Sequence, residues 1–242
     1  MKITIAYIEE PPFGWTDAGG SPCGADVELA DVVLRALGVT DIEHRLTTFA
    51  ELLPGARDGR WDVNVPLFIT PERSETVDFS VPVWAIGDGL LVRAGNPKAL
   101  DSYRAVAAQA DTRLGIITGQ VQHRSALAAG VRDEQIVLFD EQADAIDALH
   151  AGRIDAYAST ALGNRIVAER IGRSRVDAVA QAADDPHPRA PAGTFSFGKH
   201  NRALRDAFDR QLRQYLGSAD HRQRMAKYGF TASEIDPVVV AR

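Results

Sequence analysis

Cysteine is nearly absent from this sequence of 242 residues, which contains one cysteine, two methionines and six histidines. The single cysteine, Cys23, excludes an intramolecular disulfide and a metal site built from several cysteines. The histidines do not follow one another at the short spacings of metal-binding motifs. We therefore predict neither a bound metal nor a cofactor. The histidines are His44, His123, His150, His187, His200 and His221.

Long apolar runs and an excess of positive charge are also missing. No run approaches the roughly 20 apolar residues that a membrane-spanning helix needs. The net charge of −6 gives no electrostatic reason to expect nucleic acid or an anionic membrane as a partner. Hydrophobic residues make up 45% and charged residues 25%, which is typical of a soluble globular protein. The length allows one large domain or two small ones.

The common catalytic signatures are absent as well. The sequence contains no Ser-His-Asp or Cys-His arrangement, no phosphate-binding loop and no Gly-x-Gly-x-x-Gly segment. These patterns therefore give no support to a hydrolase or to a nucleotide-dependent enzyme.

What the sequence does contain is a regular alternation of strand and helix patterns. Strands alternate apolar and polar residues, and helices repeat apolar residues every three or four positions. The alternation predicts an α/β fold with helices packed on parallel sheets. The expected strands are 2–7, 42–48, 63–67, 77–79, 89–93, 114–117, 136–139, 154–158, 176–180 and 194–198. The expected helices are 26–37, 50–58, 102–108, 122–129, 141–152 (with Asp140 as N-cap), 161–171, 201–216 and 221–228.

Two turn-rich segments divide this alternation. Gly95-Asn96-Pro97 follows one expected strand, and the polar segment 181–193 contains three prolines. We therefore expect two α/β lobes connected by two hinge crossings, and a cleft between two lobes commonly holds a small molecule. The lobes are expected at 1–93 with 194–242 and at 94–193, and the crossings near 93–96 and 181–194.

Several short motifs, in order along the chain, match one bacterial family. They are Pro11-Pro12-Phe13, Gly24-Ala-Asp-Val-Glu-Leu-Ala30, Ile69-Thr-Pro-Glu-Arg73, Val77-Asp-Phe-Ser80, Leu114-Gly-Ile-Ile-Thr-Gly119, Ala151-Gly-Arg-Ile-Asp-Ala-Tyr157 and Tyr228-Gly-Phe230. The sequence thereby resembles the extracellular solute-binding proteins of family 3, the amino-acid-type receptors of ABC importers. The resemblance implies a two-lobed type II periplasmic-binding fold that closes around one small molecule. It also implies a monomer without catalytic activity that has ABC permease subunits as partners.

The cellular location has two interpretations. The sequence begins with an expected strand and shows none of the regions of a secretory signal peptide. This pattern fits either a cytoplasmic protein or the mature form of an exported one with an added Met1. The family resemblance favours the mature periplasmic form.

The resemblance assigns the ligand carboxylate to Arg73. Arginine keeps its charge and presents planar donors that fit a carboxylate, and an ion pair in a closed cleft is stronger than one at a surface. Gly119 and Gln120 are expected at a helix N-terminus, whose N–H groups would share the same carboxylate. Thr118 and Thr160 are expected to add hydroxyl contacts.

Two departures from the amino-acid receptors bear on the ligand. Those receptors usually place an aspartate just after the Asp-Ala strand of the second lobe to hold an α-ammonium group, and the corresponding residue here is Thr160. The position after Gly119, commonly threonine, is Gln120. Because a primary ammonium group without a paired anion is costly to bury, an ordinary α-amino acid is not the expected ligand.

A replacement anion is expected from the first lobe. Glu10 followed by Pro11-Pro12-Phe13 is similar to the motif of the family's ectoine and hydroxyectoine receptors, in which a glutamate holds a delocalised cation and aromatic side chains surround the ring. Aromatic faces attract such cations once they are desolvated. We therefore expect a small zwitterion with a carboxylate and a delocalised or substituted cation, either ectoine-like or a modified amino acid, enclosed by Phe13, Phe49 and Phe68.

Structural roles stay open for several of these residues. Phe49 and Phe68 would also fit a hydrophobic core. Glu10 would also fit a solvated loop, as we expect for its neighbour Glu9. Trp84 is expected to pack near the first crossing.

Two other functions also stay open. An enzyme similar to the cyclohexadienyl dehydratases, which share the fold, would need a positioned general acid in the cleft. Residues 159–164, where such enzymes carry an acidic residue, contain none. A sensory domain without transport would show the same motifs, and permease and ATPase genes beside its own gene would instead favour the receptor.

Overall fold

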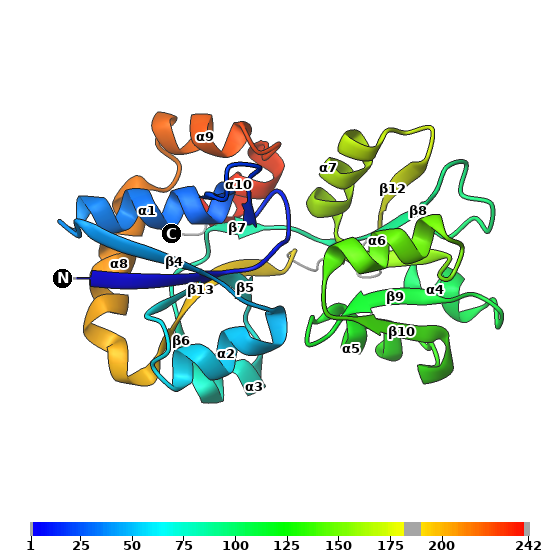
Figure 1. Cartoon of the computed structure of the whole chain (residues 1–242), viewed down its shortest axis with the longest axis horizontal. Helices are drawn as coiled ribbons and strands as arrows, with labels where there is room; N and C mark the ends of the chain where they lie inside the picture. Colours follow the sequence, from blue (N-terminus) through cyan, green and yellow to red (C-terminus); the bar gives the residue numbers. More distant parts are fainter. Residues whose placement is uncertain (1, 182–189, 240–242) are drawn as a thin grey trace. The chain divides into compact units, whose positions relative to one another are not determined.

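The computed structural model describes residues 2–181 and 190–239. The chain forms two compact units, divided after residues 86 and 188, and each is built around its own sheet (Figure 1). The first unit combines two separate segments of the chain, and the second is one continuous segment. Within the described residues, no helix is long and apolar enough to span a membrane.

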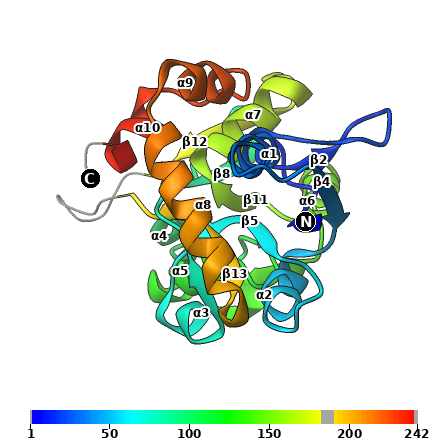
Figure 2. The same cartoon turned by 90° about the vertical axis from the view of Figure 1, so that its left-hand side faces the viewer.

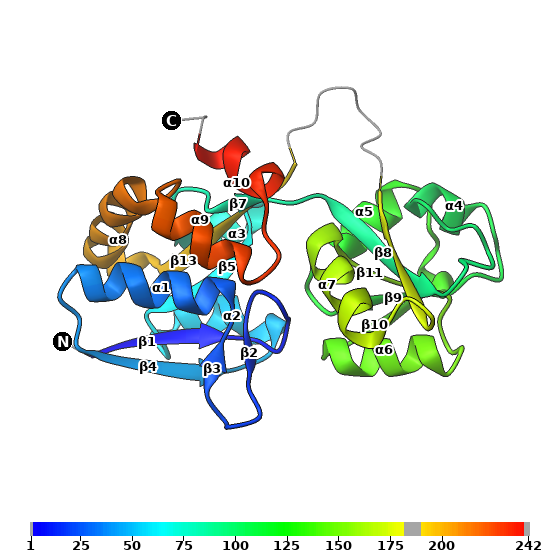
Figure 3. The same cartoon turned by 90° about the horizontal axis from the view of Figure 1, so that it is seen from above.

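The main sheet of the first unit combines parallel and antiparallel strands. Its strands are β1 (Lys2–Tyr7), β4 (Asp41–Leu46), β5 (Val63–Phe68), β6 (Val77–Phe79), β7 (Trp84–Ala85) and β13 (Ala192–Gly198). The order is β4-β1-β5-β13-β6, and β7 pairs with β13. β1 runs parallel to both of its neighbours, β4 and β5, and Figure 3 shows β1 and β4 side by side. β13 runs antiparallel to β5, β6 and β7.

Helices cover both faces of this sheet. They are α1 (Ala25–Ala36), α2 (Phe49–Arg57), α3 (Pro71–Thr76), α8 (Arg202–Tyr215), α9 (Ala219–Ala226) and α10 (Ala232–Val239), and a small hairpin joins β2 (Trp15–Thr16) to β3 (Pro22–Cys23). Phe195 and Phe197 of β13 contact Phe208 of α8, with ring centroids 5.1 and 5.4 Å apart. Gly198 faces the other side, where an added Cβ would meet the backbone of Ala56 in α2. Successive residues of β13 therefore face α8 and α2 in turn. Figure 2 shows how α8 runs across β13.

The second unit has a mixed sheet as well. Its strands are β8 (Asp88–Arg93), β9 (Leu114–Ile117), β10 (Ile136–Phe139), β11 (Ala156–Thr160) and β12 (Val176–Ala180). The order is β10-β9-β11-β8-β12, with β9 parallel to β10 and β11, and β8 antiparallel to β11 and β12. The helices are α4 (Tyr103–Ala107), α5 (Gln122–Ala128), the short η1 (Asp133–Gln135), α6 (Gln142–His150) and α7 (Ala161–Ile171).

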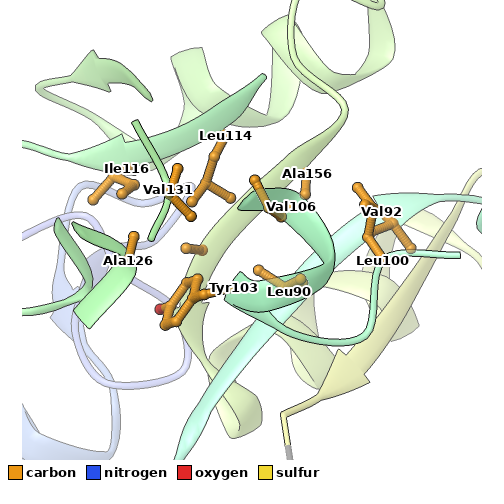
Figure 4. Packing of buried hydrophobic residues seen from close by; sticks show 11 residues of the cluster. Leu90, Val92, Leu100, Tyr103, Val106, Leu114, Ile116, Ala126, Val131 and Ala156 are labelled. Atoms are coloured by element: carbon orange, nitrogen blue, oxygen red, sulfur yellow. The ribbon is translucent and has the colours of Figure 1, made fainter. Parts of the chain in front are cut away.

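The core of the second unit lies between its sheet and helices α4 and α5 (Figure 4). Alternate residues of β8 and β9 contribute to it, because successive side chains of a strand point to opposite faces. The helices contribute Tyr103, Val106 and Ala126. The strand residues are Leu90, Val92, Leu114, Ile116, Ala156 and Ala158.

The expected strands and helices all form, with boundaries that move by up to about two residues, but three predictions about their arrangement differ from the structure. β8 was expected in the first lobe, yet it pairs with β11 and β12, so the first division comes before it, after residue 86. Residues 192 and 193, expected in the second lobe, belong to β13 in the first unit. Neither sheet is wholly parallel, because β8 and β13 are antiparallel to their neighbours.

Smaller differences concern short elements and caps. The sequence patterns missed α3, α10, β7 and the β2–β3 hairpin. The N-cap of α6 is Glu141 and not Asp140. Most of the second expected crossing, residues 182–189, lies outside the described residues.

Candidate ligand-binding site

The carboxyl ends of three parallel strands in the first unit gather predicted site residues. Glu10 follows β1, Phe49 begins α2 after β4, and Phe68 ends β5. Because β1 lies between β4 and β5 and runs parallel to both, the three strand ends lie at one edge of the sheet. In α/β proteins this is the edge at which ligands commonly bind.

Arg73 is buried beside two other predicted site residues. Thr70 caps α3 by accepting a hydrogen bond from the Arg73 backbone N–H at 3.2 Å. The Arg73 side chain is mostly buried, its Nη1 donates to the carbonyl oxygen of Phe68 at 2.7 Å, and its Cζ lies 5.3 Å from the ring centroid of Phe49. The guanidinium is therefore held in one orientation, and Arg73 is not a solvated surface residue.

Trp84 connects two of the predicted aromatic residues. Its ring centroid lies 5.3 Å from that of Phe13 and 5.6 Å from that of Phe68. Phe13 also meets Phe230 edge-on at 6.0 Å. Gly193 of β13 leaves the space for the indole, because an added Cβ would overlap its ring. Phe13 and Phe68 are only 6% and 8% exposed, so both rings also have a packing role.

A buried carboxylate, Asp26, holds this indole. Asp26 lies in the first turn of α1 and is 1% exposed, and Trp84 Nε1 donates to its Oδ1 at 3.0 Å. Burial raises the pKa of Asp26 well above its usual value, against the lowering effect of the Trp84 hydrogen bond, and the charge of Glu10 raises it further. The sequence analysis named Asp26 only as part of a family motif and gave it no role in the site. The signal that could have identified it is its position directly before the apolar stripe of the helix.

The Glu10 loop is closed by its own backbone. Glu10 N donates to the Gly14 carbonyl at 2.8 Å, and Phe13 N donates to the Glu10 carbonyl at 2.9 Å. Glu10 is half-buried. Its neighbour Glu9 is not the solvated carboxylate that we expected, since its Oε1 accepts hydrogen bonds from Thr16 N at 3.0 Å and from Thr16 Oγ1 at 2.6 Å. Glu9 thus fixes the following hairpin.

In the second unit, the predicted residues also lie at one sheet edge. Thr118, Gly119 and Gln120 follow β9 and Thr160 ends β11, and the two strands are parallel neighbours. Thr118 Oγ1 donates to the Phe139 carbonyl at 3.1 Å. Gln120 and Thr160 are mostly buried, and Gly119 adopts a φ of 85°, which favours glycine.

Two expectations for these residues change in the structure. Gly119 and Gln120 form a turn before the helix, because α5 starts at Gln122 with Val121 as its N-cap. Thr160 is the N-cap of α7, and its Oγ1 accepts a hydrogen bond from Gly163 N at 3.1 Å. The threonine oxygen therefore has a structural role at the position where amino-acid receptors carry an acid.

Asp88 was missed by sequence reasoning. Tyr103 Oη donates to its Oδ2 at 2.9 Å, and Gln122 Nε2 donates to its Oδ1 at 2.8 Å. Burial raises the pKa of Asp88, against the lowering effect of these two hydrogen bonds. Asp88 pairs with Thr160 across the β8–β11 ladder, so it anchors the start of α5 beside the predicted site. Within the described residues, no cluster of three or more acidic, histidine or cysteine side chains could hold a metal.

Two α/β units, each with polar or aromatic side chains gathered at the carboxyl ends of its parallel strands, are the arrangement of periplasmic binding proteins. The bacterial extracellular solute-binding proteins, family 3, match residues 3–231, and the chain belongs to this family.

Three similar proteins refine this assignment. The chain is 35% identical to a probable amino-acid ABC transporter periplasmic-binding protein of Sinorhizobium fredii, over 96% of this chain and 78% of that protein. The crystal structure of EhuB in complex with hydroxyectoine superimposes with a TM-score of 0.87 at 28% identity, covering 100% of this chain and 95% of EhuB. An ancestral amino-acid-binding protein, a precursor of cyclohexadienyl dehydratase, gives a TM-score of 0.80 at 23% identity over 94% and 95% of the chains, which shows a shared fold.

Proposed function

We propose that this protein is the substrate-binding receptor of an ABC importer and that its ligand is a small zwitterion of the ectoine or hydroxyectoine type. The observation that carries the proposal is the series of contacts in the first unit. Arg73 contacts Phe49 and Phe68, and Trp84 joins Phe68 to Phe13. A permanent cation and several aromatic faces are thereby fixed in one place, which suits a ligand with a carboxylate and a delocalised cation.

The charges support a delocalised cation over an α-ammonium group. Glu10 supplies a negative charge at the sheet edge that also carries the aromatic residues. Thr160 caps α7 through its oxygen, so its remaining O–H is a donor that suits an acceptor on the ligand. An α-ammonium group at Thr160 would meet no negative charge from that residue.

The similar proteins point to two classes of ligand. EhuB was crystallised with hydroxyectoine, and the Sinorhizobium relative has a name that refers to amino acids. An ordinary or modified amino acid is therefore the alternative ligand.

Calorimetric titration distinguishes these ligands. Protein that has been unfolded, dialysed and refolded, to remove any bound compound, is titrated with ectoine, hydroxyectoine, glycine betaine and the common amino acids. We expect saturable binding of ectoine or hydroxyectoine with one site per chain. Tight binding of an ordinary amino acid, and of none of the other compounds, would contradict the proposed ligand.

Glu10→Gln tests the cation site with little change in shape. A hydrogen bond to a charged group contributes about 1.5–3 kcal/mol, so we expect the affinity for ectoine to fall by about 10- to 100-fold. The control is Glu51→Gln, which alters an exposed glutamate of α2 that pairs with Arg60. Equal affinities of the two variants for ectoine would show that Glu10 does not contact the ligand.

We further propose that the protein acts without catalysis, as a monomer, in the periplasm and with permease subunits. The shared fold with a precursor of cyclohexadienyl dehydratase makes the dehydratase the second candidate. Incubation with prephenate or arogenate, followed by the absorbance of an aromatic product, tests it. Formation of product at a rate above that of the buffer would overturn the non-catalytic proposal.

A further inference from the structure

Asp26 is a buried carboxylate with an unused oxygen. It is 1% exposed, and its Oδ1 accepts the Trp84 Nε1–H at 3.0 Å. Its Oδ2 has no hydrogen-bond partner among the described residues. An apolar side chain of similar size would avoid the cost of burying this polar group. Among the described residues, Trp84 is the one hydrogen-bond partner of the Asp26 side chain, so a role for the carboxylate is to be found in what this indole does.

That partner, Trp84, contacts aromatic residues from two separate segments of the chain. Phe13 comes from the loop after β1, and Phe68 from the end of β5. Both ring centroids lie within 5.6 Å of that of Trp84. The Phe13 ring is tilted by 38° to the indole, and the Phe68 ring stands at 85° to it. The indole thus lies against both phenylalanine rings and contacts each at a different angle.

A buried indole N–H without a partner is costly, so the position of its acceptor favours one orientation of the ring. The Nε1–H bond to Asp26 selects that orientation for Trp84. Gly193 provides the room on the side of β13. Asp26 and Gly193 therefore hold the indole from two different elements, α1 and β13.

We propose that Asp26 is a positioning residue that orients Trp84 and thereby sets the spacing of Phe13 and Phe68, so that the first unit prefers flat, ring-shaped cations. This inference rests on the proposed function, since Phe13 and Phe68 must contact the ligand. Asp26 itself needs no contact with the ligand.

Three variants separate positioning from general stability. Asp26→Asn keeps an oxygen that accepts the indole N–H, Asp26→Leu removes it, and Trp84→Phe keeps an aromatic ring but removes the donor. The control is Asp31→Leu, which alters another aspartate of α1 that also accepts from a ring nitrogen, that of His44 at 2.9 Å. The loss of one well-placed hydrogen bond corresponds to a change of about 10-fold in an equilibrium constant, here the affinity for the ligand.

The first measurement is the indole N–H signal of Trp84 in a proton–nitrogen NMR spectrum of tryptophan-labelled protein. The chain has three tryptophans, so the signal that disappears in Trp84→Phe belongs to Trp84. We expect Asp26→Leu to move this signal upfield, Asp26→Asn to move it less, and Asp31→Leu to leave it in place. An unmoved signal in Asp26→Leu would overturn the positioning role. This readout needs no ligand.

The second measurement is the affinity for ectoine and hydroxyectoine. We expect Asp26→Leu to weaken binding by about 10-fold and Asp26→Asn to weaken it by less than about 3-fold. In the Trp84→Phe background, Asp26→Leu should have no further effect, because the donor is already gone. Equal affinities of Asp26→Leu and wild type, with a displaced Trp84 signal, would overturn the proposal. If wild type binds no compound, the proposed function fails, and the NMR signal still decides whether Asp26 orients the indole.

Discussion

The guanidinium of Arg73 donates a hydrogen bond to the carbonyl oxygen of Phe68 at 2.7 Å. Arg73, which is predicted to bind the ligand carboxylate, is therefore fixed to the backbone of Phe68, which is predicted to enclose the ligand. α3, six residues long, brings the two together by turning the chain directly after β5. A substitution of Arg73, or a shift of the backbone at Phe68, is thus expected to alter the position of the other residue.

Arg73→Lys should weaken binding of the proposed zwitterion by about 10-fold or more, because lysine keeps the charge but loses the two-pronged hydrogen bonding to a carboxylate, and one hydrogen bond to a charged group contributes about 1.5–3 kcal/mol. A lysine ammonium cannot hold the Phe68 carbonyl, stay beside the Phe49 ring and bind a carboxylate in two places at once. The measurement is calorimetric titration with ectoine. The control is Arg57→Lys, an exposed arginine of α2 paired with Asp58. Unchanged affinity in Arg73→Lys would show that the carboxylate binds elsewhere.

Thr160→Asp should raise the affinity for ordinary α-amino acids by about 10-fold or more, since a bond to a charged group contributes about 1.5–3 kcal/mol. Aspartate is as good an N-cap as threonine, so α7 should keep its start. Thr160→Asn supplies the control, because it also caps the helix but adds no charge. A titration series with the common amino acids measures the effect. The same gain in both variants, or none in either, would contradict a role for charge at this position.

Gly193→Ala should destabilise the first unit by about 1–3 kcal/mol, the usual cost of overpacking. The new methyl group would overlap the Trp84 ring, and Gly193 also pairs with Phe68 across the β5–β13 ladder. Gly87→Ala is the control, because among the described residues no atom beyond its chain neighbours lies within 4 Å of its added Cβ. Urea unfolding followed by tryptophan fluorescence reports on the first unit, which contains all three tryptophans. Identical unfolding midpoints for the two variants would contradict the packing described for Trp84.

The stability of the protein should depend on pH through Asp26. Its pKa is raised in the folded state by burial and by the charge of Glu10, against the effect of Trp84. The folded protein therefore keeps this proton to a higher pH than the unfolded chain, whose aspartates titrate near about 3.9. Stability should fall as pH rises from that value through the raised pKa.

Asp26→Asn isolates this contribution, because asparagine does not titrate and keeps an acceptor for the indole. The difference in unfolding free energy, wild type minus variant, should decrease with rising pH over that range. Urea unfolding at a series of pH values measures it. A difference that stays constant with pH would show that Asp26 titrates alike in the folded and unfolded states.

The sequence patterns predicted most elements because the period of apolar residues is a local property. Lys2–Tyr7 forms the strand that its alternation predicts, with the same ends. The six-residue helix α3 was missed, although Thr70 followed by Pro71 is a helix-start pattern, because Pro71–Thr76 shows no repeat of apolar residues. Local patterns thus predict most elements, the three-residue β6 included, but miss α3 and α10.

Pairing between distant strands could not be predicted in the same way. The strong turn signal at Gly95-Asn96-Pro97 suggested a crossing there, whereas the chain passes into the second unit at Ile86 and Gly87, where the signal is weak. The direction of β8 and β13 within their sheets depends on these crossings and not on alternation.

The candidate site was predictable only where its residues belong to local sequence motifs. Residues inside motifs, such as Arg73 and Phe68, were named from the sequence, and the structure brings them into contact. Asp26 and Asp88 were not named, because their burial depends on partners 58 and 34 residues away, Trp84 and Gln122.

The backbone joins the two segments of the first unit where the second unit leaves and returns. Ile86 N donates to the Pro191 carbonyl at 3.0 Å, and β7 pairs with β13. In terms of chain connectivity, residues 87–188 are therefore an insertion between two hydrogen-bonded positions of one domain. A short linker from Ile86 to Pro191 would excise the insertion without cutting any strand of the first sheet. The first unit, with Arg73 and the aromatic residues around Trp84, would then exist as a separate protein.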